Sequence, residues 1–388
     1  MFTIFSYRIS EKQLLIAILL LGAVLRFWGL GSAEFYHDEG FLAFRSIGYL
    51  DYIQNDAQTT PVQWFNNAPT LPWWTQLSFH DHPPLFFLIQ NIFFKIFGVS
   101  LFIARLPSVI SGILSIYLIY LISKRIFDEK NKLIIFFAPL LLSVSSIHIW
   151  ISRSSLQESV QIFFILWNMY YFLKLTDGRS TKANYHPNTE IHWILFGLTL
   201  GLAFLTKYTS FFLVPVYLSY FAYQSYRSYQ SNKSYKSDKS YQSDNPDNPY
   251  KSDKSYSSTS LTASWIYLFF AFGLALLLFS PVLIYNFYLW KTVGHFDLQF
   301  SYLFGQNTPE WQALLGKIQD PFSDIIKNLV FMYSLPFLLL TIAGIIYGFL
   351  AVIKKFRVNP FAPLDVRLSN GASPARWRSH RGSPDEIE

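Results

Sequence analysis

The chain has no cysteine among its 388 residues, which excludes disulfides, thiolate nucleophiles and cysteine-based zinc sites. Charged residues are also scarce, at 14%, against roughly 25% in soluble proteins. Hydrophobic residues reach 52% and aromatic residues 19%, which is typical of an integral membrane protein with aromatic belts at the bilayer interfaces. The formal charge of +7 does not indicate a nucleic-acid partner, because cytoplasmic loops of membrane proteins collect Lys and Arg.

Four catalytic motifs are absent as well. The sequence has no GxxxxGK[ST], no GxGxxG after a strand, no HExxH and no GxSxG. P-loop, Rossmann, zincin and serine-hydrolase chemistry therefore have no local support.

What the chain has instead is a series of long apolar segments. A helix needs ~20 mostly apolar residues to cross the hydrocarbon core, and eight segments are candidates. They lie near 13–30, 103–123, 133–151, 157–174, 191–206, 209–224, 263–288 and 328–353. No small-residue cleavage site follows the first, so we expect it to stay as an anchor. The expected fold class is all-α, a polytopic membrane protein of about eight transmembrane helices.

Basic residues set the orientation. If the N-terminus is cytoplasmic, most of the 31 Lys and Arg residues fall on the cytoplasmic side, as the positive-inside rule requires. The long segment 31–102 then faces outward from a plasma (inner) membrane. Within it, the apolar run 83–98 is short for a crossing, and we interpret it as a helix lying in the interface. The alternative, that it crosses, would invert everything after it.

The remaining regions follow from this topology. The segment 225–260 repeats Ser, Tyr, Asp and Lys without an apolar period, which predicts a disordered cytoplasmic linker. The expected regions are 1–30 (N-terminus and first span), 31–102 (outer loop with interfacial helices), 103–224 (spans two to six), 225–260 (linker), 261–353 (spans seven and eight with an outer loop near 290–327) and 354–388 (cytoplasmic basic tail).

Asp38 and Glu39, in the run EFYHDEGF just after the first span, form the most informative polar feature. Ionisable groups at a membrane boundary are costly to desolvate, so we expect a polar neighbourhood and a function. An acid at position 38 can accept a proton from a group that arrives from the outer aqueous side. The alternative is that both acids stabilise the first turn of a helix that starts near Gly40.

The turn HDHPPL places His80, Asp81 and His82 beside two prolines. Two histidines and an aspartate can ligate a divalent metal, but this spacing is a weak metal signature. The same groups can instead donate hydrogen bonds to a phosphate. We expect no metal and no cofactor, and a divalent metal at this turn remains the alternative.

Three cations head or join spans on the outer face, namely Arg105, Arg153 and Lys207. Together they can surround an anionic headgroup and neutralise charge that grows on a departing phosphate. The alternative is that each only anchors its helix to lipid headgroups. Asn286, with Asp297 beyond it, adds hydrogen-bonding groups on this face, although packing of polar helix ends explains them equally well.

From about Arg26 to Asn286 the sequence resembles the GT-C glycosyltransferases, membrane enzymes that use polyprenyl-phosphate sugars. It looks most like the bacterial branch with protein O-mannosyltransferase-like and aminoarabinose-transferase-like proteins. The ordered strings are YHDEGFLAF, HPPLFFLIQNIFFKIFG, ARLPSVISGIL, ISRSSLQES, GLTLGLAFLTKYTS and SPVLIYNF. The resemblance implies a lipid-borne sugar donor, membrane lipids as partners and an acceptor (lipid, glycan or protein) that the sequence leaves open.

By that resemblance Asp38 deprotonates the acceptor, which attacks the anomeric carbon with inversion, while Glu39 orients or assists. Adjacent helical residues point roughly 100° apart, so the two acids are not a facing glycosidase-type pair. The implied donor-phosphate contacts are His82, Arg105, Arg153 and Lys207, and the further substrate contacts are His80 and Asn286.

Two other functions stay open. A transporter or flippase of a lipid-linked substrate would show interrupted helices and charges near the bilayer midplane, whereas the predicted spans contain almost no charge. A truncated, non-catalytic relative is the second alternative, because members of the family usually continue with further spans after the point where this sequence stops.

Overall fold

The computed structural model describes residues 2–4, 7–35, 37–48, 72–77, 82–127, 132–176, 189–241 and 258–306, with Leu339, Ile342 and Ile346. This part of the chain is almost entirely helical. Its elements are β1 (Phe2–Ile4), β2 (Tyr7–Ile9), α1 (Glu11–Phe27), α2 (His37–Ile47), η2 (Trp73–Leu77), α3 (Leu85–Phe97), α4 (Leu101–Ile126), α5 (Lys132–Val144), α6 (Ser146–Arg153), α7 (Gln157–Thr176), α8 (Thr189–Thr206), η5 (Tyr208–Phe212), α9 (Leu213–Tyr241), α10 (Ser258–Val293) and α11 (Leu298–Leu303).

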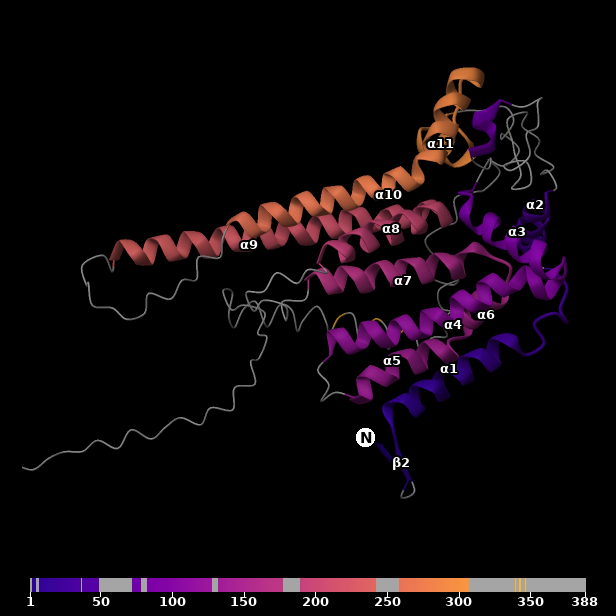
Figure 1. The fold of residues 1–388 in the computed structure, drawn as a ribbon, viewed down its shortest axis with the longest axis horizontal. Coiled ribbons are helices and arrows are strands. Elements are labelled where there is room, and N and C mark those ends of the chain that lie inside the picture. The colour runs from indigo at the N-terminus through magenta and orange to yellow at the C-terminus, as the bar shows by residue number, and fades with distance from the viewer. Residues whose placement is uncertain are drawn as a thin grey trace, which may run out of the picture.

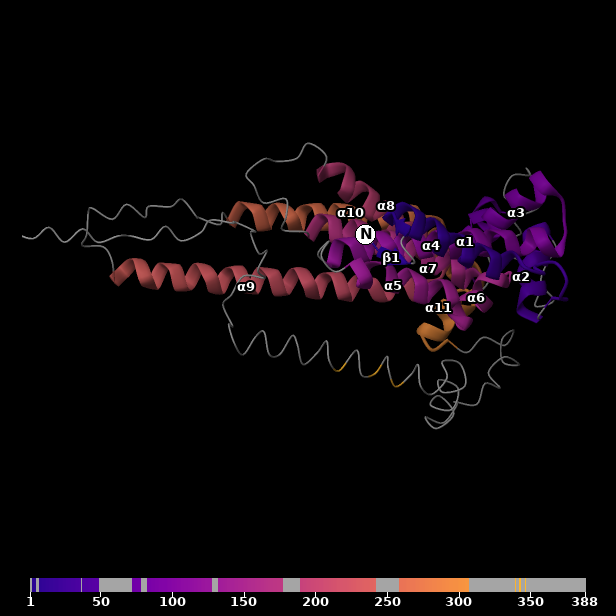
Figure 2. The same cartoon turned by 90° about the horizontal axis from the view of Figure 1, so that it is seen from below.

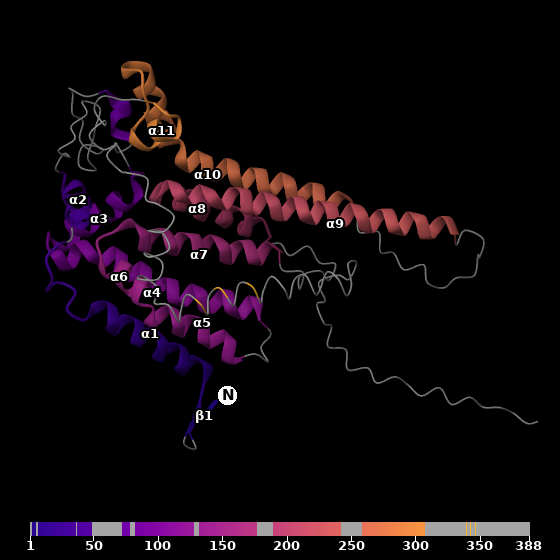
Figure 3. The same cartoon turned by 180° about the vertical axis from the view of Figure 1, so that it is seen from behind.

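The long helices form a layered bundle. Figure 1 shows α1, α4, α7, α8 and α10 side by side with their axes roughly aligned, and the view from behind shows the same order (Figure 3). The short helices α2, α3 and α11 lie together at one end of the bundle, opposite the end toward which α9 extends (Figures 1 and 2). We call the end with α2, α3 and α11 the site end.

The all-α membrane fold is confirmed. By length and composition α4 and Ser264–Val293 can each cross a membrane, and α5 with α6, bent by 54°, forms a third span if the pair counts as one. The first seven predicted spans overlap with the helices α1, α4, α5–α6, α7, α8, η5–α9 and α10, and the predicted number of eight spans stays a prediction. The predicted span near 328–353 lies outside the described residues except for the three isolated ones.

Two features differ from the sequence expectations. A short antiparallel hairpin, β1 with β2, precedes the first helix. In addition, α9 continues to Tyr241, so the first part of the predicted linker 225–260 is helical. No proline occurs in that segment before Pro246, and Lys, Gln and Ser tolerate a helix that an apolar first half has already nucleated. The predicted tail 354–388 lies outside the described residues.

Close approach of α8 and α10 depends on two glycines spaced four residues apart. A Cβ added at Gly197 would lie 2.6 Å from the carbonyl oxygen of Ala271, and one at Gly201 would lie 3.0 Å from that of Ala275. Small residues at this spacing let membrane helices pack backbone to backbone. This contact holds α10 beside α8, and so fixes where the ends of both helices lie at the site end.

At the site end one apolar cluster joins four helices. It contains Leu42 of α2, Phe86 and Phe87 of α3, Val160 of α7 and Ala203 of α8. Leu42 lies one turn after Asp38, and Ala203 lies one turn before Lys207. The cluster therefore brings the acidic helix α2 and the lysine-bearing end of α8 onto the same core.

Candidate active site

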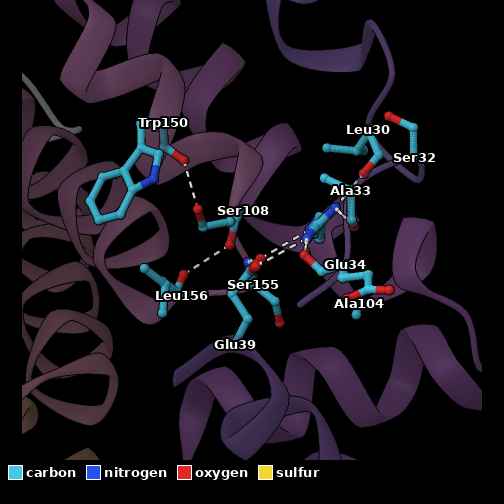
Figure 4. A network of polar contacts seen from close by, with 12 residues as sticks. Leu30, Ser32, Ala33, Glu34, Glu39, Ala104, Ser108, Trp150, Ser155 and Leu156 are labelled. Carbon is cyan, nitrogen blue, oxygen red and sulfur yellow. Dashed lines mark hydrogen bonds and ion pairs between the residues drawn. The ribbon is translucent and has the colours of Figure 1, made fainter. Parts of the chain in front are cut away.

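The centre of the site is a buried ion pair between Glu39 and Arg105, which are 3% and 5% exposed. The Nε and Nη2 atoms of Arg105 each donate to one carboxylate oxygen of Glu39 at 3.0 Å. The other three N–H groups donate to the carbonyls of Leu30 at 2.7 Å, Ala33 at 3.0 Å and Glu34 at 2.9 Å (Figure 4). A guanidinium has five N–H donors, so every donor of Arg105 has a protein acceptor.

This ion pair fixes the path of the chain between α1 and α2. Leu30 to Glu34 form the connection after α1, and Arg105 sits near the start of α4. Glu39 also accepts a hydrogen bond from the backbone N–H of Ser155 at 2.6 Å (Figure 4). The pair thus ties α2, α4 and the turn between α6 and α7 together, and it orients the first turn of α2.

Asp38 occupies that first turn but is exposed, while its neighbour Glu39 is buried. The two carboxylates therefore point into different environments, as the helical geometry predicts for adjacent residues. The acids also lie in the first turn of a helix, where the helix dipole favours negative charge. An exposed carboxylate on a helix that a buried ion pair holds in place is suited to receive a proton from an arriving substrate.

The predicted cations differ in what they contact. Arg153 donates from Nη1 to the carbonyls of Leu25 at 3.0 Å and Trp28 at 2.6 Å, so it caps the last turn of α1. Lys207 forms an ion pair with Glu158, with 2.6 Å between Nζ and Oε1, and the two side chains are 29% and 35% exposed. Of these three cations, Arg105 is buried, while Arg153 and Lys207 are both half-buried. Lys207 is the one of these two whose side chain does not cap a helix.

The segment that carries Lys207 is held from two sides. Gln161 of α7 donates to the hydroxyls of Thr209 and Ser210, both at 2.8 Å. Tyr208 donates to the Oδ2 atom of the fully buried Asp297 at 3.3 Å. The backbone at Lys207 is therefore anchored to α7 and to the start of α11.

Asn286 is buried and is engaged within the protein. Its Nδ2 atom donates to Asp297 Oδ2 at 3.1 Å, and its Oδ1 atom accepts from the backbone N–H of Asp297 at 2.9 Å. These contacts place Asn286 in the joint between α10 and α11. A substrate contact, which the sequence predicts for it, would have to compete with this joint.

His82 is described, half-buried, and packs edge-on against Phe87 with 6.4 Å between ring centroids. The predicted substrate contact His80 and its neighbour Asp81 lie outside the described residues. Among the residues that the structure describes, no three His, Asp or Glu side chains gather where they could hold a metal ion. The metal alternative for the HDHPPL turn stays a prediction.

Sequence reasoning missed three polar residues of this region. Arg26 is fully buried and donates to the carbonyl of Ser143 at 3.1 Å and to Nδ1 of His148 at 2.7 Å. Because arginine only donates, His148 must accept at Nδ1. The third is Glu158, in the first turn of α7. Its position directly after a predicted outer turn, inside ISRSSLQES, was the only signal in the sequence.

Comparison with known proteins gives three kinds of match. The family model described as dolichyl-phosphate-mannose-protein mannosyltransferase matches residues 81–236. An undecaprenyl phosphate-alpha-4-amino-4-deoxy-L-arabinose arabinosyl transferase of Wigglesworthia glossinidia brevipalpis is 26% identical over 44% of this chain and 30% of its own length. The putative mannosyltransferase YycA of Bacillus subtilis is 30% identical over 34% of this chain and 18% of its own length. The chain thus spans less than a third of either relative.

Two solved structures are also similar. The Saccharomyces cerevisiae protein O-mannosyltransferase Pmt1-Pmt2 complex bound to the sugar donor aligns with a TM-score of 0.49 and 18% identity over 82% of this chain and 38% of that one. The Archaeoglobus fulgidus oligosaccharyltransferase aligns with a TM-score of 0.47 and 16% identity over 88% and 43%. The family match and the curated relatives confirm the resemblance to the GT-C membrane glycosyltransferases that was seen in the sequence.

Proposed function

We propose that this protein transfers a sugar from a polyprenyl-phosphate donor to an acceptor on the non-cytoplasmic face of the plasma membrane, with inversion at the anomeric carbon. The observation that carries the proposal is that two adjacent acids in the first turn of α2 lie in different environments. Asp38 is exposed, whereas Glu39 is buried in an ion pair with Arg105 of α4. This arrangement leaves one carboxylate exposed at the site end, while the ion pair ties its helix to α4.

The donor class is supported by the names of the relatives. One carries undecaprenyl phosphate in its name, and the matching family is described by dolichyl-phosphate-mannose. In both names the sugar is attached to a lipid phosphate. A donor of this kind reaches a membrane-embedded site through the bilayer, so it does not need the soluble nucleotide-binding motifs that the sequence lacks.

The proposed reaction assigns one proton and one electron pair to named groups. Asp38 accepts the proton of the acceptor hydroxyl or amine as the acceptor atom forms its bond to the anomeric carbon. The bond between that carbon and the phosphate oxygen breaks, and its electron pair leaves with the polyprenyl phosphate. Lys207 is the cation best placed to neutralise the growing charge, because its ammonium has three N–H donors and one of them goes to Glu158. Preorganised cations of this kind stabilise a leaving phosphate.

Arg105 has a different role in this proposal than the sequence suggested. Its five donors are all engaged, so we assign it to positioning α2 rather than to binding the phosphate. Arg153 likewise serves to hold the end of α1. His82 remains a proposed phosphate contact, and His80 and Asn286 remain proposed substrate contacts.

The proposed function is tested by mass spectrometry of lipid-linked sugars in cells. Deletion of the gene should cause one polyprenyl-phosphate sugar to accumulate, because its consumer is missing, and the mass of that lipid identifies the sugar. Complementation with the wild-type gene should return the lipid to its original level. An unchanged set of lipid-linked sugars after deletion would contradict the proposed donor class.

A further inference from the structure

The ion pair between Glu158 and Lys207 has a feature that the proposed reaction does not use. Lys207 Nζ lies 2.6 Å from Glu158 Oε1. The other carboxylate oxygen of Glu158, Oε2, is buried and accepts no hydrogen bond from the residues that the structure describes. A carboxylate thus lies directly against the cation that we assign to the donor phosphate, and the inference below rests on that assignment.

The backbone on both sides of this ion pair is held in place. The residues that follow Lys207 are anchored through Gln161, which donates to Thr209 and Ser210, and through the hydrogen bond from Tyr208 to Asp297. Glu158 is fixed in the first turn of α7. A phosphate that binds Lys207 must therefore approach a cation whose charge Glu158 already offsets.

The charge of the phosphate changes during the proposed reaction. The donor is a phosphodiester with one negative charge, whereas the released polyprenyl phosphate is a monoester with a charge between about −1.5 and −2 at pH 7. Repulsion by a neighbouring carboxylate grows in proportion to the charge of the ligand. Glu158 must disfavour the product more strongly than the donor.

We infer that Glu158 competes with the phosphate for Lys207 and so promotes release of the polyprenyl phosphate product. In the resting protein the carboxylate holds the ammonium. Donor binding displaces part of this contact, and after sugar transfer the extra negative charge on the monoester favours its replacement by Glu158. The carboxylate thus restores Lys207 for the next donor.

The test is a binding measurement, so it does not depend on turnover. Protein in lipid nanodiscs is titrated with farnesyl phosphate as the monoester and with farnesyl methyl phosphate as the diester. Glu158→Gln, which keeps the shape of the side chain, should bind the monoester about tenfold more tightly than wild type and the diester by a clearly smaller factor. Glu158→Ala should likewise tighten binding of the monoester more than binding of the diester. The effect on the monoester should shrink at high salt, because part of the site is solvent-exposed.

Lys207→Met separates the two ways in which the inference can fail. If Lys207→Met weakens binding of both lipids but Glu158→Gln and Glu158→Ala tighten neither, or tighten both lipids equally, the role of Glu158 is wrong and the phosphate site stands. If Lys207→Met binds both lipids as wild type does, the phosphate site of the proposed function is wrong, and the inference is lost with it.

Discussion

Asp38→Asn should reduce sugar transfer by about 100- to 10,000-fold, the range lost when a general base is removed. The amide is nearly isosteric with the carboxylate but cannot accept the proton of the acceptor. Because Asp38 is exposed and the adjacent Glu39 carries the buried contacts, the fold should be unaffected. The measurement is the rate of transfer from a polyprenyl-phosphate sugar by purified protein, with the donor identified from the lipid analysis.

Glu34→Gln is the matched control for this prediction. Glu34 is an exposed acid in the same connection between α1 and α2, and it contributes its backbone carbonyl to Arg105. Removing its charge should leave transfer unchanged. Normal transfer by Asp38→Asn, in protein that still inserts into the membrane, would remove Asp38 from the mechanism.

Arg105→Met should destabilise the protein by about 3–5 kcal/mol, because it leaves the buried carboxylate of Glu39 without its partner. It also removes the donors that hold the carbonyls of Leu30, Ala33 and Glu34. Transfer should fall as well, since the first turn of α2 loses its anchor. The thermal unfolding midpoint in detergent measures the first effect, and the transfer rate measures the second.

Two comparisons separate this ion pair from an ordinary one. Lys207→Met breaks a pair whose side chains are about one-third exposed, and it should cost no more than about 1 kcal/mol. The double variant Glu39→Leu with Arg105→Met should recover part of the stability lost in Arg105→Met, because no unpaired charge remains. Equal midpoints for Arg105→Met and the wild type would show that the pair does not hold the site together.

The sequence predicted the helices that depend on local patterns. The runs near 103–123 and 263–288 are long and apolar, and they correspond to α4 and α10. The helical extension to Tyr241 was missed because its residues have no apolar period. The preceding apolar turns of α9 nucleate the helix, and the polar residues only continue it.

The site was predicted less completely, because its contacts are between residues far apart in the chain. Asp38 and Glu39 were identified as important, but a sequence cannot show that one is exposed and the other buried. The partner of Glu39 lies 66 residues away at Arg105, and Arg26 reaches His148 over 122 residues. No local spacing encodes such pairs, so Arg105 was assigned to the phosphate and Glu158 was overlooked.

The central claim is that Asp38 faces the non-cytoplasmic side, and cysteine labelling tests it directly. The chain has no cysteine, so Asp38→Cys carries a single reactive thiol. Ser10→Cys, at the exposed start of α1, reports the opposite end of the bundle. In intact cells, a membrane-impermeant maleimide should label position 38 at once and position 10 only after permeabilisation. Labelling of position 38 that required permeabilisation would contradict the proposed site.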